Sequence, residues 1–251
     1  MTSARITFLG TGEAFDAQAN NTSIYIRTAS VSYLVDCGFT VPHTLWRVNA
    51  DPNLIDVIYL THFHGDHVFG LPALLLRMKE DGRSKPLAIL GQTGVKTFVE
   101  RLQNFAYAGT FKELGFPLNA IEVSAQKEQR LGPHTLTFHP TRHVVTNLAL
   151  RLAFGDFSLF VSGDGELSPE SIDALRTSRY AVQECFAVDG ERKFHATFQS
   201  LCDVLEKGTP RPQRTFLVHP ARTERERLEE AAASSGLPVV VPRDLQMYDL
   251  D

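Results

Sequence analysis

The residues with the clearest chemistry lie in the stretch THFHGDHVFG, which starts at position 61. His62, His64, Asp66 and His67 fall within six consecutive positions. In an extended segment, residues two apart point to the same side, so His62 and His64 can meet one cation. The glycine between the two pairs permits a tight bend that returns Asp66 and His67 toward the same centre. Residue types and spacing therefore favour a metal site over a polar turn.

The number of ligands in this stretch points to more than one ion. Four ligand-type side chains exceed what one tetrahedral zinc ion needs once ligands from elsewhere in the chain are added, so we expect two metal ions. Asp36, Asp164 and His219 each follow a predicted strand, at the point where it ends. Loops at strand ends are where α/β scaffolds collect functional groups.

Short strands alternate with helices along the whole chain. Strands are predicted over 6–10, 23–27, 32–36, 56–60, 86–91, 134–140, 147–154, 157–163, 181–186, 215–219 and 238–241, and helices over 41–49, 67–80, 93–105, 168–177, 196–207 and 223–234. The pattern over 106–120 predicts neither. No internal repeat or linker divides the chain, so we expect one layered α/β domain over 1–251, with helices outside packed sheets.

The composition narrows the class of protein. The chain has 251 residues, of which 43% are hydrophobic and 22% charged, as is typical of a globular protein. The net charge of −4 argues against a nucleic-acid binder driven by charge. The three cysteines, Cys37, Cys185 and Cys202, are widely spaced, which fits reduced thiols in the cytoplasm. No stretch reaches the 18 or so apolar residues of a membrane span, so we expect a cytoplasmic protein that does not bind a membrane.

The motif THFHGDH, followed by strand-end aspartate and histidine residues, resembles the metallo-β-lactamase superfamily. The segments FLGTGEAF, NNTSIYI and YLVDCG resemble the branch that contains ribonuclease Z and its phosphodiesterase relatives. The similarity runs from residue 6 to about residue 220. It implies a four-layer αββα sandwich in a single domain and, by resemblance alone, a homodimer.

The resemblance also implies a ligand set for two metal ions. One zinc ion would be held by His62, His64 and His143, the second by Asp66, His67 and His219, and Asp164 would bridge both. His139 is the alternative to His143, but the family's ligand stands just before the next strand, which fits His143 better. Asp36 is expected to orient the metal loop by hydrogen bonds rather than to bind metal. His/Asp ligation suits zinc, although manganese or iron occupy similar sites.

The candidate catalytic residues are Asp66, His195 and Glu184. Two zinc ions that share a bridging hydroxide could attack a phosphodiester and neutralise its oxygens. By resemblance, His195 in KFHATF contacts the scissile phosphate or assists the leaving group, and Glu184 in AVQECF fixes its ring. Thr197 is placed to cap the helix that follows.

The spacing between His143 and Asp164 bears on the substrate. Long ribonuclease Z proteins insert a tRNA-gripping arm between these two motifs, whereas here only 20 residues intervene. We therefore expect a zinc-dependent phosphodiesterase acting on a small or cyclic phosphodiester, an anionic ester. Ribonuclease Z activity on tRNA 3′ ends is the alternative, as is another superfamily hydrolase such as an arylsulfatase or lactonase. A catalytically silent metal-binding module would be a different class of protein.

Overall fold

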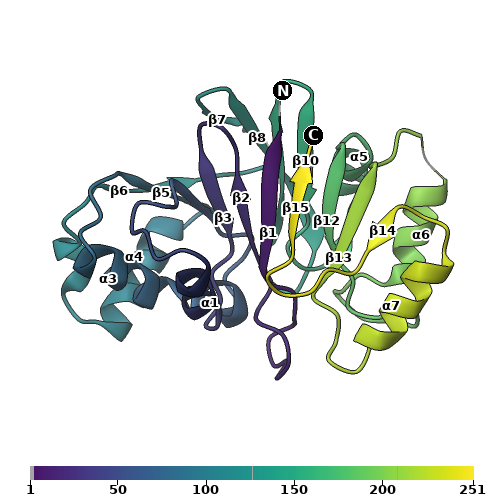
Figure 1. Ribbon diagram of the computed structural model, residues 1–251, viewed down its shortest axis with the longest axis horizontal. Helices are drawn as coiled ribbons and strands as arrows, with labels where there is room; N and C mark the ends of the chain where they lie inside the picture. The colour runs from purple at the N-terminus through teal and green to yellow at the C-terminus, as the bar shows by residue number, and fades with distance from the viewer. Residues whose placement is uncertain (1–2, 126, 208) are drawn as a thin grey trace.

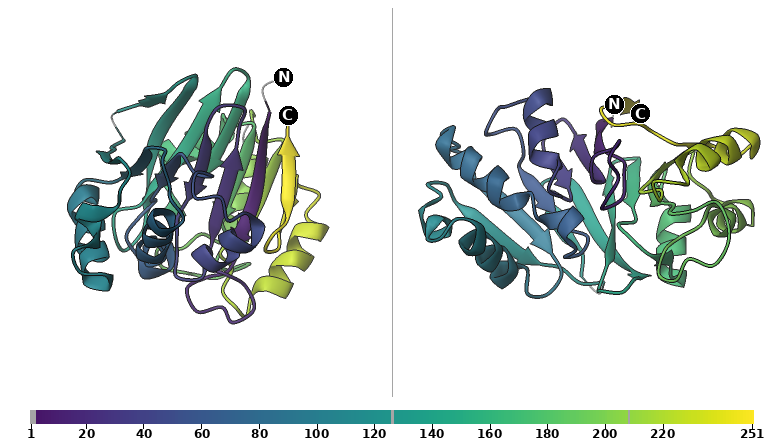
Figure 2. Two further views of the ribbon diagram at one scale, coloured as in Figure 1. Left: turned by 60° about the vertical axis from the view of Figure 1, so that its left-hand side comes forward. Right: turned by 90° about the horizontal axis from the view of Figure 1, so that it is seen from below.

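The computed structural model describes residues 3–125, 127–207 and 209–251. Two β-sheets pack face to face in the centre, and helices cover the outer face of each (Figure 1). The view from below shows these layers, with the helices of the two halves on opposite flanks (Figure 2). This is the predicted αββα sandwich. The extent of the domain over 1–251 stays a prediction.

The N-terminal half and the last strand form a seven-stranded sheet. The C-terminal strand lies beside the first strand and pairs with it antiparallel, which brings the two ends of the chain together (Figure 1). In spatial order the strands are β15 (Met247–Leu250), β1 (Ala4–Gly10), β2 (Ser23–Arg27), β3 (Ser32–Val35), β4 (Val57–Tyr59), β5 (Leu87–Gly91) and β6 (Leu118–Glu122). Helices α1 (Val41–Val48), α3 (Leu71–Glu80) and α4 (Val95–Ala106) cover its outer face, with the short helices α2 (Gly65–Val68) and η1 (Thr110–Glu113) in the connections.

The second half of the chain forms the eight-stranded sheet. Its order is β11 (Glu166–Leu167), β8 (His134–Arg142), β9 (Leu148–Phe154), β10 (Phe157–Val161), β12 (Tyr180–Glu184), β13 (Arg214–Val218) and β14 (Val239–Val240), with β7 (Gln129–Leu131) paired to β8. Helices α5 (Pro169–Arg176), α6 (Phe198–Glu206) and α7 (Arg225–Ser234) cover its outer face. Strands β3 and β4 run parallel, as do β10, β12 and β13, so each set ends at a common edge of its sheet.

Strand alternation divides the apolar side chains between the layers. On β12, Tyr180 and Val182 face the core between the two sheets, and Ala181 faces the layer beneath the helices. Phe8 and Phe216, one from each sheet, meet in the central core with ring centroids 5.2 Å apart. Burying one such side chain contributes about 1.5–3 kcal/mol, so the central layer holds the two halves together.

The predicted helix over 67–80 is wrong, because the chain forms two helices there. Helix α2 ends at Val68 and α3 starts at Leu71. Gly70 between them packs against the backbone, where an added Cβ atom would lie 2.2 Å from the carbonyl oxygen of Gly38. Pro72 favours a new helix start at this point. The break separates the turn that carries Asp66 from the longer packing helix.

The sequence prediction also missed strands β6, β7, β11 and β15. These strands are short, and most of their residues are partly or fully exposed, so they lack the apolar pattern that predicts a strand. Pairing with a neighbour defines them: β15 follows Ala4–Thr7 of β1 in antiparallel register. Within the described residues, none of the helices has the length and apolar character needed to cross a membrane.

Candidate metal centre

The stretch that carries the clustered histidines leaves the end of β4 and is held by Asp36, at the end of the neighbouring strand β3. Asp36 is buried and has a φ of 61°. One of its oxygens accepts a hydrogen bond from the Thr61 amide at 2.8 Å, and the other accepts from the Thr61 hydroxyl and from His67 Nδ1, both at 2.8 Å. The structure thus gives Asp36 the orienting contacts predicted for it.

A first group of imidazoles converges beside this stretch. His64 Nδ1 lies 3.1 Å from His62 Nε2 and 3.2 Å from His143 Nε2. His143 comes from the loop after β8, and its Nδ1 donates to the carbonyl oxygen of Phe194 at 3.0 Å. That hydrogen bond leaves the Nε2 lone pair facing the other two rings. Similarly, the Thr61 hydroxyl oxygen lies 3.0 Å from Nδ1 of His62, the ring nitrogen that does not face His64.

A second group joins Asp66, His67 and His219, the last of which follows β13. Asp66 Oδ2 lies 3.3 Å from the Nε2 atoms of both His67 and His219. Asp164 stands between the two groups. Its Oδ1 is 3.4 Å from His67 Nε2, and its Oδ2 is 3.5 Å from His219 Nε2 and 3.8 Å from His62 Nε2. Asp164 therefore has an oxygen near each of the two groups.

Two observations support these donor atoms as ligands of a metal ion. In each group, counting Asp164 with the first, the candidate ligand atoms lie within 4.8 Å of one another. His67 Nε2 is buried and lacks a hydrogen-bond partner among the described residues, although its Nδ1 is fixed on Asp36. In a metal-ligating histidine, one ring nitrogen is usually anchored by a hydrogen bond and the other faces the metal ion. His67 has this arrangement, because Nδ1 is held by Asp36 and Nε2 faces the carboxylates of Asp66 and Asp164. Nitrogen and carboxylate donors suit zinc.

Within the first group, the pKa values of His62 and His64 are both lowered. Burial, reinforced by nearby His67, lowers the pKa of His62 well below its ordinary value. Burial and the adjacent His143 also lower the pKa of His64. Neutral imidazole is the form that ligates metal, so neither side chain has to lose a proton first.

In the second group, the pKa values of the two histidines are raised instead of lowered. Burial would lower the pKa of His67, but the carboxylates of Asp164 and Asp36 raise it well above its ordinary value. Burial likewise opposes protonation of His219, yet Asp164 and Asp66 raise its pKa to about 9. The carboxylates therefore stabilise a positive charge beside the Nε2 atoms of His67 and His219. A bound cation would supply that charge and displace the protons.

Glu184 and His195 form a hydrogen-bonded pair beside the first group. Glu184 is fully buried at the end of β12, and its Oε1 accepts from His195 Nδ1. Its Oε2 accepts from the amides of Gly165 and Ala196 at 3.0 Å and 2.9 Å. Asp164 and His219 also lie within ligand distance of Glu184, but its two oxygens already accept three hydrogen bonds. We therefore read Glu184 as the anchor of His195.

The ring of His195 lies between Phe186 and His143 of the first ligand group. It stacks on Phe186 with centroids 4.5 Å apart and meets the edge of His143 at 5.2 Å. Its side chain is 24% exposed. Burial works against the charged ring, but the Glu184 carboxylate raises the pKa of His195 above its ordinary value. Thr197 caps helix α6 through a capping box with Ser200, as predicted.

Asn147 and Thr141 hold the loop of Asp164, and the sequence analysis identified neither. The Asn147 side chain donates through Nδ2 to the Ser162 carbonyl oxygen at 2.9 Å, and its Oδ1 accepts from the backbone N–H of Asp164 at 3.2 Å. The Thr141 hydroxyl donates to the Asp164 carbonyl oxygen at 2.6 Å. Gly165 has a φ of 109°, so glycine suits this position. Nothing in the local sequence signals these contacts, because strand pairing creates them.

The alternative ligand, His139, lies on β8 and belongs to neither group. Its Nε2 contacts the Thr137 hydroxyl at 3.0 Å. His134, at the start of the same strand, is buried between the sheets, and its Nδ1 lies 2.6 Å from the Tyr33 hydroxyl. The structure thus brings together all seven predicted ligands, with His143 rather than His139 among them.

The comparisons with known proteins agree with this fold. The metallo-β-lactamase fold protein YhfI from Bacillus subtilis superposes with a TM-score of 0.81 and 20% identity, covering 99% of this chain and 100% of that one. Ribonuclease BN from Erwinia tasmaniensis is 36% identical over 151 residues, which are 59% of this chain and 48% of the relative. Ribonuclease Z from Methanococcus maripaludis is 32% identical over 149 residues, 58% of this chain and 47% of the relative. The matches span about half the length of these two relatives.

The chain therefore has the metallo-β-lactamase fold, and its sequence is similar to proteins of the ribonuclease Z-like branch. Within that class it belongs to the family described as Anti-Pycsar protein Apyc1, whose model matches residues 4–235.

Proposed function

We propose that this chain is a binuclear zinc-dependent phosphodiesterase that hydrolyses a small or cyclic phosphodiester. The observation that carries the proposal is Asp164, whose two oxygens face both ligand groups while the Glu184–His195 pair stands beside the first. One ion would be held by His62, His64 and His143, the other by Asp66, His67 and His219, and both by Asp164. Bound metal ions would activate water at neutral pH and neutralise the oxygens of the phosphodiester.

The protein's own residues then place and move the proton. Because Glu184 holds Nδ1 of His195 and raises its pKa, the ring keeps a proton on Nε2, beside the first ligand group. From there it can donate to the oxygen that leaves as the phosphorus–oxygen bond breaks. The hydrogen bond to Glu184 prevents the ring from turning. Asp36 performs the equivalent orienting role for His67.

The connection between His143 and Asp164 supports a small substrate. It consists of a short loop, strand β9, a tight turn and strand β10, so there is no inserted arm to hold a folded RNA. The second candidate function, cleavage of RNA at the 3′ end of tRNA, is favoured by the sequence similarity to a ribonuclease BN and a ribonuclease Z.

Metal analysis and a substrate panel test the proposal together. Protein purified without added metal should contain about two equivalents of zinc. His143→Ala should lose metal and turnover of bis(p-nitrophenyl) phosphate, whereas the matched control His139→Ala, four positions earlier on β8, should keep both. One equivalent or none in the wild type would refute the binuclear site.

The panel decides between the substrates. Cyclic nucleotides, a 3′-extended tRNA precursor, an aryl sulfate and a lactone are assayed on the metal-replete enzyme. The proposal requires the cyclic nucleotides to give the highest kcat/KM. Preferential cleavage of the precursor would establish the second candidate instead, and a better sulfate or lactone would move the assignment to another hydrolase of the superfamily.

A further inference from the structure

His219 differs from other histidines of the metal centre in how its ring is held. The Nδ1 atoms of His62, His67 and His143 each lie 2.8–3.0 Å from an oxygen atom of a neighbouring residue. The Nε2 atom of His219 faces the carboxylates of the site, but its Nδ1 is buried and has no hydrogen-bond partner among the described residues. A ligating histidine usually has such a partner, which fixes the orientation of the ring. The direction of His219 must therefore be fixed in another way.

The loop that follows β1 holds the backbone of His219. The φ of His219 is 61°, which lies in the left-handed region that residues other than glycine rarely adopt. Its backbone N–H donates to the carbonyl oxygen of Thr11 at 2.8 Å. Because the backbone sets the direction of the Cα–Cβ bond, this hydrogen bond determines where the side chain starts. The side chain is buried, which leaves the ring little freedom to turn from there.

Thr11 is itself held by side chains from distant parts of the chain. It is fully buried, and its hydroxyl donates to Asp244 Oδ1 at 2.9 Å. Arg225, the first residue of α7, donates from Nη2 to both the hydroxyl and the carbonyl oxygen of Thr11 at 3.1 Å. The other oxygen of Asp244 accepts from the backbone and the side chain of Asn20 at 2.7 Å and 2.8 Å. Segments that are far apart in the sequence thus converge on one residue of the FLGTGEAF motif.

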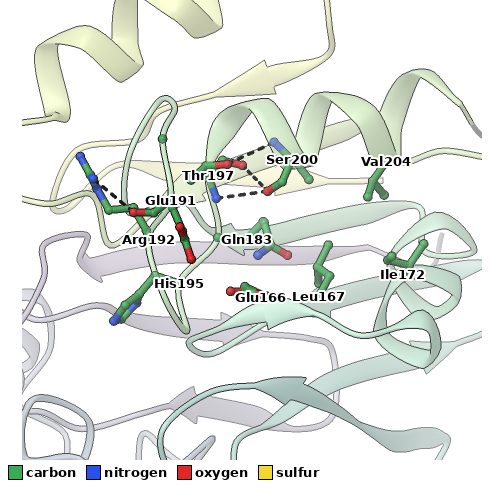
Figure 3. Close-up of a pocket in the computed structure, with 13 residues that line it drawn as sticks. Glu166, Leu167, Ile172, Gln183, Glu191, Arg192, His195, Thr197, Ser200 and Val204 are labelled. Atoms are coloured by element: carbon green, nitrogen blue, oxygen red, sulfur yellow. Dashed lines mark hydrogen bonds between the residues drawn. The ribbon is translucent and has the colours of Figure 1, made fainter.

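The cavity on the outer face of the second sheet does not take part in this support. It has a volume of about 380 Å³ and lies between helices α5 and α6, with Gln183 and His195 among its lining residues (Figure 3). His219 and the other predicted metal ligands are absent from its lining. Segment 194–196, which is hydrogen-bonded to Glu184, separates it from the metal centre. The cavity therefore leaves the orientation of His219 to the loop after β1.

We propose that Thr11 is a positioning residue for the second ion of the metal centre. It sets the direction of His219 Nε2 through the backbone, and Arg225 and Asp244 keep it in place. The inference rests on the proposed function for the presence of two metal ions, but it does not depend on the substrate. A hydroxyl group outside the ligand set then controls the affinity of the second ion. The first ion is affected little, because other residues anchor its histidines.

Removal of the hydroxyl tests the proposal. In Thr11→Val the shape of the side chain and the carbonyl acceptor are kept, but Asp244 and Arg225 each lose a partner. We expect the apparent dissociation constant of the second zinc ion to rise by about 10–100-fold, the range for partners that orient ligands, and that of the first to stay within about threefold. Competition with a chelator, starting from zinc-loaded protein, measures both constants. His219→Ala shows which of them belongs to the second group.

Two further variants separate positioning from a general loss of structure. Thr11→Ser restores the hydroxyl and should return the second constant to within about threefold of the wild-type value. The matched control is Thr215→Val on β13, which removes another buried threonine hydroxyl, one without a hydrogen-bond partner among the described residues. It should change neither constant. A lower thermal stability of Thr11→Val with both zinc constants unchanged would make Thr11 a structural residue and overturn the inference.

A last variant makes the outcome for this inference separable from that for the proposed function. Arg225→Met removes both hydrogen bonds to Thr11 and should raise the second constant as Thr11→Val does. If the wild type binds two zinc ions but hydrolyses no phosphodiester, the proposed function fails, while a weaker second ion in both variants still supports the role of Thr11. If the wild type is active with two ions and both variants keep the second constant, the inference is overturned and the proposed function stands. A wild type that binds fewer than two ions would overturn both.

Discussion

The two halves of the sandwich supply the site in opposite ways. The N-terminal sheet provides His62, His64, Asp66 and His67 from one stretch that leaves β4 and enters α2. The C-terminal sheet provides single residues from separate loops, after β8, β10, β12 and β13. In the first half the spacing along the chain sets the geometry, and in the second half the pairing of strands does. This difference explains why the ligands of the N-terminal sheet form a recognisable sequence motif, whereas those of the C-terminal sheet are scattered along the chain.

The two halves are also anchored differently. Asp36 alone accepts three hydrogen bonds from the stretch after β4, through Thr61 and His67. The loop of Asp164 depends on Thr141, near the end of β8, and on Asn147, just before β9. A single buried carboxylate therefore orients the compact half, while a network of neutral groups orients the dispersed half.

The strongest way to break this comparison is to remove the residue shared by both ligand groups. Asp164→Ala should lower turnover of a chromogenic phosphodiester by about a thousandfold or more, because metal-ion stabilisation of the transition state is worth several kcal/mol. It should also release metal from both groups, measured as equivalents per chain. Asp173→Ala on the exposed side of α5 is the control. Retention of two equivalents in Asp164→Ala would show that the halves hold metal independently.

His195→Ala tests a part of the dispersed half that should not hold metal. We expect kcat to fall by about 10²–10⁴-fold, the usual contribution of a positioned general acid, with little change in KM. Metal content should equal that of the wild type, because Glu184 and His195 lie beside the ligand groups. Loss of metal from this variant would turn the pair into a structural support for the site.

Asp36→Asn weakens the anchor of the compact half. The amide cannot accept both the Thr61 and His67 hydrogen bonds as a carboxylate does, so metal affinity should fall by about 10–100-fold, the range seen for partners that orient ligands. Competition with a chelator measures this, with the circular dichroism of the metal-free variant as the folding control. Unchanged affinity would mean that packing, and not Asp36, orients His67.

Glu184→Gln is expected to have the smallest effect and sharpens the role of the pair. Because the carboxylate raises the pKa of His195, a neutral amide lets that pKa fall. A group that works as an acid then loses its proton at lower pH, so the alkaline limb of the kcat/KM profile should move to lower pH. The rate on the acid side of that limb should change little. An alkaline limb in the same place as in the wild type would exclude His195 as the acid.

Several features of the fold were predictable because the chain encodes them locally. The strand over 23–27 was predicted with its observed bounds, and apolar β-branched runs placed the core strands to within a few residues. The helix predicted over 67–80 failed because Gly70 meets the backbone of Gly38, a contact between distant parts of the chain. Strand β15 was missed for the same kind of reason, since its pairing with β1 joins the two ends of the sequence.

The candidate site, too, has a part that the local sequence determines and a part that depends on contacts between distant segments. The sequence by itself determined the ligand types of the compact stretch, since residues two apart in an extended segment share a face whatever surrounds them. The family resemblance supplied His143, Asp164 and His219, and only the packed sheets bring their side chains within reach of one another.

Tertiary structure also decided what no local pattern contains. Asn147 meets Asp164, and Gln183 faces a cavity on the opposite side of the sheet from Glu184, because hydrogen bonds and burial depend on which strands become neighbours. Residue type and spacing specify which atoms can bind a metal, and long-range packing specifies where those atoms stand and which of their neighbours are left without a partner.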